Sequence, residues 1–422
     1  MNSLPPAIST EAQGHLRHNY LVNVLDGSFF GFALGIASLT TILPLFVSHM
    51  TSSALLIGLI PSIHTIGWHL PQLFMAPLVS RLPVFRPTVL KATVHERLPF
   101  LGLALVSAFL AAGYLSLALV FTFVLLVWQG LGAGFTANPW QNMISKVIPD
   151  DMRATFFGVQ SAAANLMGGL GALLAGALLQ QFSYPQSYTL IFLAASLSLV
   201  VSWIFLSRTR EAPKAVPMES APSLHDLRRI VRRLPENRPF SGYLAARLLS
   251  QFGLMAGGFY IVYASRAFGI DGLQAGFLTS VYLVTQVIAN PLLGQLADRW
   301  SKKGTLVIGA FANAASALLA WLAPNLNWFY AVYVLIGIAT VAYWTIGMAF
   351  SLDFGSDDER PLYVGLANTL VTPAAILAPL LGGWLADGPG FGATFLVACV
   401  ASVITVLVLL LFVHDPAQRP AR

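Results

Sequence analysis

The feature that most limits the fold of this chain is a series of long apolar segments separated by short polar ones. We delimit twelve such segments, at residues 20–46, 53–79, 88–111, 115–142, 154–182, 187–207, 241–265, 273–297, 304–323, 328–352, 361–385 and 391–413. A helix needs about 20 apolar residues to cross a hydrocarbon core roughly 30 Å thick. Hydrophobic residues make up 56% of the chain and charged residues only 9%. The sequence therefore predicts an all-α integral membrane protein with twelve transmembrane helices.

The positions of the basic residues predict how these helices are oriented. If both termini lie on one side, 21 of the 23 Lys and Arg residues fall on or near that side, with Arg247 inside a segment and Arg266 opposite. Basic residues near helix ends resist translocation, so that side is expected to be cytoplasmic. We therefore expect a multi-pass protein of the cell membrane with cytoplasmic tails at 1–19 and 414–422.

One longer polar segment, 208–240, separates a first half at 20–207 from a second half at 241–413. Residues 223–238 place Leu, Ile and Val on one helical stripe between arginines. This pattern predicts a basic amphipathic helix that binds anionic lipids of the inner leaflet. The alternative is a solvated linker that only follows the distribution of positive charge.

The two halves repeat each other. A gapless shift of 207 residues superimposes Asp150/Asp357, Asp151/Asp358, Arg153/Arg360, Gly158/Gly365 and Gly176/Gly383. A shift of 218 residues superimposes Gly58/Gly276, Ser62/Ser280 and Arg81/Arg299. Two like halves predict a pseudo-symmetric pair of bundles that rock about a site near the middle of the membrane.

The stretch "GQLADRWSKKG", between the eighth and ninth segments, carries the most specific motif. Gly294, Asp298, Arg299, Lys302 and Lys303 match a loop signature of the major facilitator superfamily, which the chain resembles over nearly its full length. The resemblance implies two six-helix bundles and a permease that works by alternating access. The chain departs from the family pattern at two positions. Ser80 stands where the family has an acid in the equivalent loop of the first half, and Leu126 stands where the family has an arginine in the fourth span.

We expect the charged loops to form a gate on the cytoplasmic side. A carboxylate at one helix end can accept hydrogen bonds from the N-terminus of a neighbouring helix. Asp298 should face the start of the fifth span near Arg153, whereas Ser80 should face the start of the eleventh near Arg360 with only a hydroxyl. The gating residues are Arg81, Arg153, Gly294, Asp298, Arg299, Lys302, Lys303 and Arg360. The alternative is a surface turn with screened charges.

Asp26 is the clearest ionisable residue inside a predicted span. Asn19, Asn23 and Asp26 share one helical face of the first span. Burial favours the neutral form of a carboxylic acid, so we predict that Asp26 couples transport to protons. The alternative is a structural carboxylate tied to nearby amides or to Arg247.

The third span begins with "KATVHERLPF" and reaches full length only if this polar stretch is included. Glu96 and Arg97 are therefore predicted to form a buried pair. In the family this span is peripheral, so the resemblance favours a structural pair over a substrate contact.

Scattered polar and aromatic residues are expected on the cavity-facing spans. The predicted cavity residues are Asn23, His69, Asn138, Gln141, Gln160, Gln251, Tyr263, Gln286, Trp344 and Asn368. A mainly apolar cavity with few fixed charges suits a neutral or amphipathic organic solute better than a phosphate or dicarboxylate.

The leading hypothesis is a secondary active transporter that exports a small organic solute in exchange for protons. The alternatives are a proton-coupled uptake permease and a non-transporting receptor on the same fold. Motifs for phosphate binding, zinc hydrolysis or a serine nucleophile are missing, so an enzyme is not expected. We expect a monomer with no cofactor, no metal and no nucleic-acid partner.

Overall fold

A computed structural model describes residues 10–79, 81–213, 238–351, 353–354 and 360–413. All regular elements in these ranges are helices. The first half contains α1 (Thr10–Ile36), α2 (Ile42–Ser48), α3 (Ala54–Val79), α4 (Arg86–Phe109), α5 (Leu115–Val147), α6 (Asp150–Gln181) and α7 (Gln186–Ser207). The second half contains α9 (Arg238–Leu254), α10 (Gly257–Phe268), α11 (Gly272–Arg299), α12 (Lys302–Leu322), α13 (Asn327–Val341), η1 (Ala342–Ile346), α14 (Gly347–Ser351), α15 (Arg360–Asp387) and α16 (Phe391–Phe412).

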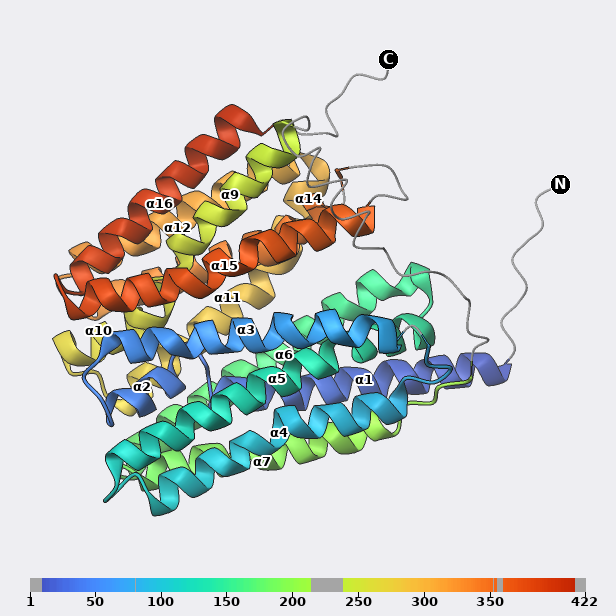
Figure 1. The fold of residues 1–422 in the computed structure, drawn as a ribbon, viewed down its shortest axis with the longest axis horizontal. Helices are drawn as coiled ribbons and strands as arrows, with labels where there is room; N and C mark the ends of the chain where they lie inside the picture. Colours follow the sequence, from blue (N-terminus) through green and yellow to red (C-terminus); the bar gives the residue numbers. More distant parts are fainter. Residues whose placement is uncertain (1–9, 80, 214–237, 352, 355–359, 414–422) are drawn as a thin grey trace.

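The halves form two bundles of antiparallel helices that lie side by side (Figure 1). This arrangement confirms the predicted all-α membrane fold. The first helix begins at Thr10, about ten residues before the predicted boundary of the N-terminal tail, because about three polar helical turns precede the apolar segment.

Three of the predicted spans are not continuous α-helices. The first is broken between Ile36 and Ile42, and the seventh between Leu254 and Gly257. A shift of 218 residues places Ile36 over Leu254, so the two breaks begin at equivalent points of the repeat. The tenth span contains the short π-helical segment η1, a geometry often found at functional sites.

Among the described residues, ten helical segments are long and apolar enough to cross a membrane. The helices α1 and α4 lie outside that set, although both run the length of the first bundle (Figure 1). Each carries ionisable residues within its length, Asp26 in α1 and Glu96 and Arg97 in α4. These two helices thus bring the buried charges into the bundle.

The halves meet through matching pairs of helices, α3 with α15 and α6 with α11. Ser62 donates a hydrogen bond to the Ile376 carbonyl (2.8 Å), and Ser280 donates to the Gly169 carbonyl (2.7 Å). The donors are 218 residues apart and the acceptors 207 apart, which are the two shifts of the sequence repeat. The predicted pseudo-symmetry therefore describes the interface between the halves.

Glycines allow the backbones of the two halves to touch at this interface. A Cβ added at Gly58 would overlap the Pro379 carbonyl, and one at Gly276 would lie 2.5 Å from the Ala172 carbonyl. These two contacts are again related by the repeat. Small residues of this kind are typical where membrane helices pack closely.

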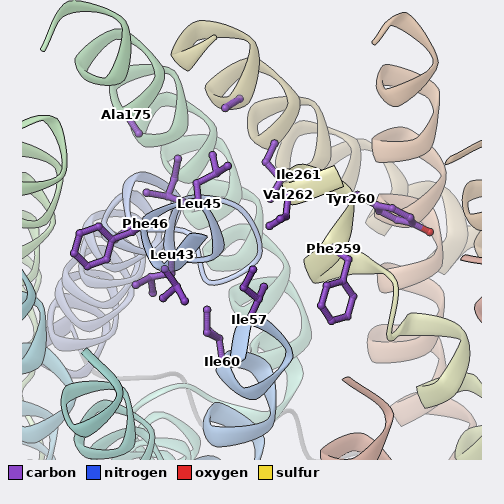
Figure 2. Close-up of a cluster of buried hydrophobic side chains, with 14 of the residues drawn as sticks. Leu43, Leu45, Phe46, Ile57, Ile60, Ala175, Phe259, Tyr260, Ile261 and Val262 are labelled. Atoms are coloured by element: carbon purple, nitrogen blue, oxygen red, sulfur yellow. The ribbon is translucent and has the colours of Figure 1, made fainter. Parts of the chain in front are cut away.

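These contacts lie toward the end of the bundle formed by α2, α10, the start of α3 and the end of α15, which we call the closed end. Leu43, Phe46, Ile57, Phe259 and Ile261 are buried there and come from α2, α3 and α10 (Figure 2). Figure 2 shows residues of α2 and α3 from the first half beside residues of α10 from the second half, and all of them belong to one buried apolar cluster. An apolar plug therefore seals this end.

A polar contact between the halves borders the plug. The Asp387 carboxylate, at the end of α15, accepts hydrogen bonds from Ser53 Oγ (2.8 Å), Ala54 N (2.5 Å) and Leu55 N (2.9 Å) at the start of α3. Arg266 Nη2 donates to the Ser52 carbonyl at 3.1 Å. We call the contact between Asp387 and residues 53–55 the closed-end clasp.

The two bundles diverge away from the closed end (Figure 1). The opposite end carries Arg17, Arg81, Arg86, Arg208 and Arg299, and we call it the basic end. Among the described residues, the hydrogen bonds that cross between the halves involve positions 41–62 and 169 of the first half, all toward the closed end.

Candidate functional site

The polar face of α1 lies inside the first half. Asn19, Asn23 and Asp26 are all buried. Asn19 donates to the Arg210 carbonyl at 2.8 Å and accepts from its backbone N–H at 2.8 Å. Asn23 donates to Thr209 Oγ1 at 3.1 Å. The two amides thus fix α1 to the segment that follows α7, and Asp26 is left to contact other helices.

Asp26 lies in a buried ion cluster, which we define as Asp26, Glu96, Arg97 and Ser202. Arg97 Nη2 lies 3.2 Å from Asp26 Oδ1, and the two side chains are 9% and 6% exposed. Arg97 Nη2 also donates to Ser202 Oγ at 2.9 Å, and Ser202 Oγ donates to Asp26 Oδ1 at 2.5 Å. The cluster therefore joins α1, α4 and α7 through one carboxylate.

A glycine stripe on α1 brings this helix against α6. A Cβ at Gly27 would lie 2.5 Å from Gln160 Cγ, and Cβ atoms at Gly31 and Gly35 would overlap the backbone of α6. The spacing of four residues keeps the stripe on one helix face. Close packing of α1 on α6 therefore places Asp26 and Gln160 beside the same space.

That space is a cavity of about 210 Å³ lined by the first half alone. Its aromatic wall consists of Phe30, Trp68 and Trp140. The polar lining residues are Asp26, Thr93, Glu96, Arg97, Thr136, Gln160 and Ser161. The cavity combines a mainly apolar wall with three ionisable side chains, an arrangement suited to a small organic ligand.

Glu96 is buried and lines the cavity, yet it forms no ion pair with any described residue. It lies within electrostatic reach of both Arg97 and Asp26. With both acids ionised, the cluster has one more negative charge than positive charges. Such a charge is costly to bury unless it is compensated.

Two sequence-based pairings differ from the structure. Arg97 pairs with Asp26, whereas the sequence paired it with Glu96, because the guanidinium reaches across to α1 rather than along its own helix. The sequence also offered Arg247 as a partner for Asp26. In the structure Arg247 Nη1 instead donates to Asn368 Oδ1 at 3.2 Å within the second half.

The predicted cavity residues fall at several places. Gln160 lines the cavity, and its Nε2 also donates to the Asn23 carbonyl at 2.8 Å. Asn23 is wholly buried and its amide bonds within the first half, so it does not line the cavity. Tyr263 packs its ring among the phenyl rings of Phe268, Phe329, Phe391 and Phe395, because its helix faces the aromatic core of the second half.

The other predicted cavity residues are not brought together with Gln160. His69 Nδ1 lies 2.9 Å from the Thr65 carbonyl of its own helix. Asn138 and Gln141 are on α5, Gln251 is on α9, Gln286 is on α11, Trp344 is in η1 and Asn368 is on α15. None of them lines the 210 Å³ cavity.

The predicted gate residues lie at the basic end. Lys302 Nζ forms an ion pair with Asp353 Oδ1 at 2.7 Å, and Lys303 Nζ donates to the Leu410 carbonyl at 3.1 Å. Arg81, Asp298 and Arg299 are exposed, and Gly294 lies in α11. Arg153 donates to the carbonyls of Ile148 and Ser145 in its own half. The contact between Asp298 and the start of α6 stays a prediction.

Part of the predicted machinery lies outside the described residues. This applies to Ser80, to the side chain of Arg360, to the linker from 214 to 237, which includes most of the predicted lipid-binding helix at 223–238, and to the tails at 1–9 and 414–422.

Three residues that the sequence reasoning missed organise the structure. Ser202 completes the ion cluster, and Asp387 forms the closed-end clasp. Glu211 accepts from the backbone N–H of Phe85 (2.9 Å) and Arg86 (2.7 Å) and pairs with Lys146 Nζ at 2.8 Å. Asp387 and Glu211 each follow the end of an apolar segment, which was the available signal.

Within the described ranges, no group of three His, Cys, Asp or Glu side chains is placed to hold a metal ion.

Comparison with known proteins agrees with this architecture. The sequence model of the Major Facilitator Superfamily matches residues 28–264 and 243–422 of this chain. A multidrug resistance protein of Bacillus subtilis (strain 168) is 25% identical over 156 residues, which is 36% of this chain and 39% of that protein. The vesicular acetylcholine transporter of Mus musculus is 30% identical over 153 residues, 36% of this chain and 29% of that protein. The matched segments thus span about two fifths or less of these relatives.

Solved structures resemble the whole chain. A nucleoside transporter superimposes with a TM-score of 0.74 at 14% identity, covering 93% of this chain and 99% of that one. A D-xylose–proton symporter superimposes with a TM-score of 0.71 at 16% identity, covering 96% of this chain and 100% of that one. At such identities the likeness concerns the fold. The match of the family's sequence model to both halves establishes that the chain belongs to the major facilitator superfamily.

Proposed function

We propose that this transporter exports a small organic solute in exchange for protons by alternating access. The observation that carries the proposal is the buried ion pair of Asp26 and Arg97 beside the cavity. Ionisable residues inside a membrane are costly and typically mark ion pathways. Asp26 is the member of the pair that can bind a proton, and protonation removes its attraction for Arg97.

The direction of transport is supported by the names of similar proteins. One is a multidrug resistance protein, and another is a tetracycline resistance protein of Pasteurella multocida, 28% identical over 146 residues. Both names describe protection of a cell from a compound, which fits export. Uptake driven by protons remains the alternative, favoured by the likeness to a D-xylose–proton symporter.

The arrangement of the bundles supports a cycle between two open states. The halves are sealed at the closed end and diverge toward the basic end (Figure 1). We propose that the basic end faces the cytoplasm, in agreement with the distribution of Lys and Arg. The structure then corresponds to an inward-facing state in which an exporter takes up its solute.

The test is transport by the purified protein in liposomes under an imposed pH gradient, across a panel of small organic solutes. Wild type is expected to accumulate at least one solute only while the gradient lasts, and Asp26→Asn should abolish that dependence. Asp271→Asn is the matched control because Asp271 is an exposed acid remote from the cluster. Flux by wild type that is equal with and without the gradient would refute proton coupling.

A further inference from the structure

The ion cluster contains a second buried carboxylic acid, Glu96, which forms no ion pair with a described residue. Arg97 contacts Asp26 and Ser202, and Glu96 has no cation partner among the described residues. Glu96 is only 7% exposed. A carboxylate so buried needs either a proton or a positive charge from outside the protein. Glu96 is therefore a buried position that holds either a proton or a cation from outside the protein.

The cavity next to Glu96 suits an organic cation. Trp68 and Trp140 belong to its wall, and indole faces attract cations more strongly than other aromatic rings do. Phe30 already lies under the Arg97 guanidinium, 5.2 Å from its ring centre. At about 210 Å³ the cavity is smaller than the roughly 300–1,000 Å³ typical of drug-sized ligand sites. The ligand it fits is a small one.

We propose that Glu96 binds the positive charge of a small monovalent organic cation, such as an amine or a quaternary ammonium ion, as the transported solute. This inference rests on the proposed exchange with protons and names its substrate class. It differs from the sequence-based expectation of a neutral or amphipathic solute, which did not include an unpaired acid in the cavity.

Arg97 links the cation to the proton. Its Nε has no hydrogen-bond partner among the described residues, so the guanidinium has a buried donor that can accept a new partner. When Asp26 binds a proton, its attraction for Arg97 is lost, and Arg97 turns to the neighbouring Glu96 carboxylate. The organic cation then leaves Glu96. The cluster thus exchanges one proton for one cation and keeps its total charge.

The groups that face Asp26 leave no other candidate for this exchange among the described residues. Arg97 and Glu96 face it from α4 and Ser202 from α7. The neighbouring cavity walls are Gln160 from α6, Thr136 and Trp140 from α5, and Trp68 from α3, none of them charged. Among the described residues, Arg97 and Glu96 are therefore the charges placed to respond when Asp26 gains a proton.

The test compares phenyltrimethylammonium with tert-butylbenzene, a neutral molecule of the same shape, by calorimetric titration of the full-length protein in lipid nanodiscs. Wild type is expected to bind the cation at least tenfold more tightly. The affinity for the cation should fall up to tenfold per unit decrease in pH, because each bound cation replaces at most one proton. Equal affinities for the two ligands in wild type would overturn the proposal, and this outcome needs no variant.

Glu96→Gln removes the charge and keeps the shape of the side chain. It should lose the preference for the cation and bind the neutral ligand as wild type does, a split that misfolding would not produce. Unchanged cation affinity in this variant would overturn the proposal, whereas Asp271→Asn should match wild type. If liposomes show gradient-driven flux of a neutral solute but no cation preference, this inference fails and the proposed exchange stands. If no gradient-driven flux occurs, the proposed function itself fails.

Discussion

The closed-end clasp predicts that one exposed carboxylate biases the whole transporter toward the state described above. Asp387 accepts three hydrogen bonds from the start of α3, two of them from backbone N–H groups of the first turn. The first N–H groups of a helix have no partner within the helix. When the closed end opens, α3 and α15 separate, and water replaces the carboxylate.

The size of the effect follows from the chemistry of helix caps. Loss of a capping side chain costs about 0.5–2 kcal/mol, and water competes for the exposed Asp387. For an exposed carboxylate the lower part of this range applies, and about 0.5–1 kcal/mol corresponds to about a two- to fivefold shift between two states. Asp387→Gln should therefore raise the ratio of closed-end-open to closed-end-closed molecules by about that factor.

The repeat supplies a variant that separates the tie between the halves from simple helix capping. Shifts of 218 and 207 residues place Ser53 over Asp271 and Asp387 over Gln180. Asp271 caps its own helix, since it accepts from the Gln274 backbone N–H at 2.7 Å. At α3 the acid comes instead from the other half. The double variant Ser53→Asp with Asp387→Gln should cap α3 from within and leave the halves untied.

The assay measures the distance between two spin labels at the closed end by double electron–electron resonance. Ser116→Cys and Asn327→Cys are exposed labelling sites in the two halves, with Cys399→Ala to remove the native thiol. Asp387→Gln and the double variant should both show a larger long-distance population, and Asp271→Asn should not. Restoration of the wild-type distribution in the double variant would refute the clasp, because capping alone would then explain the effect.

Three further outcomes follow from the structure. Arg97→Met should lower stability by about 3–5 kcal/mol by leaving Asp26 buried without its partner, and Asp26→Asn in the same chain should recover part of it; thermal unfolding in detergent measures both. Gly58→Leu should hold the closed end apart, because a side chain at this position would overlap the Pro379 backbone. The control Gly158→Ala, where an added side chain meets no neighbour, should leave the spin-label distances unchanged. Exchange of one proton for one monovalent cation should be electroneutral, so an imposed membrane potential without a pH gradient should drive no accumulation in liposomes.

The parts of the fold that depend on local pattern were predictable. Segment length and composition gave the helices, and gapless shifts gave the repeat. Ser62 and Ser280 were paired by one shift in the sequence, and both proved to be donors to the opposite half. A residue-by-residue repeat carries this information because equivalent residues occupy equivalent positions in the two halves.

Contacts between helices were less predictable. Helical periodicity placed Asp26 on a face with Asn19 and Asn23, yet it does not say which neighbour that face meets. The partner of Arg97 depends on how α1 and α4 are rotated against each other, and the sequence therefore paired it with its neighbour Glu96. An acid at the N-terminus of a neighbouring helix stays a prediction for Asp298, and the structure shows such a contact for Asp387, which the sequence did not indicate.

The repeat also reveals where the halves are unequal, and this predicts which half responds to ions. In the first half, α4 and α7 are joined by Arg97 and Ser202 within the ion cluster. In the second half, the matching helices α12 and α16 are joined by a neutral hydrogen bond from Asn313 Nδ2 to Ser402 Oγ at 2.9 Å.

A neutral contact keeps its strength when protons or cations bind, whereas an ion pair in a buried site does not. Asp26→Asn at constant pH should therefore increase amide hydrogen exchange in α1, α4 and α7 and leave α12 and α16 unchanged. An equal increase in both halves would show that the ion cluster stabilises the whole protein. In that case the ion cluster would not be the element through which a bound proton moves one half against the other.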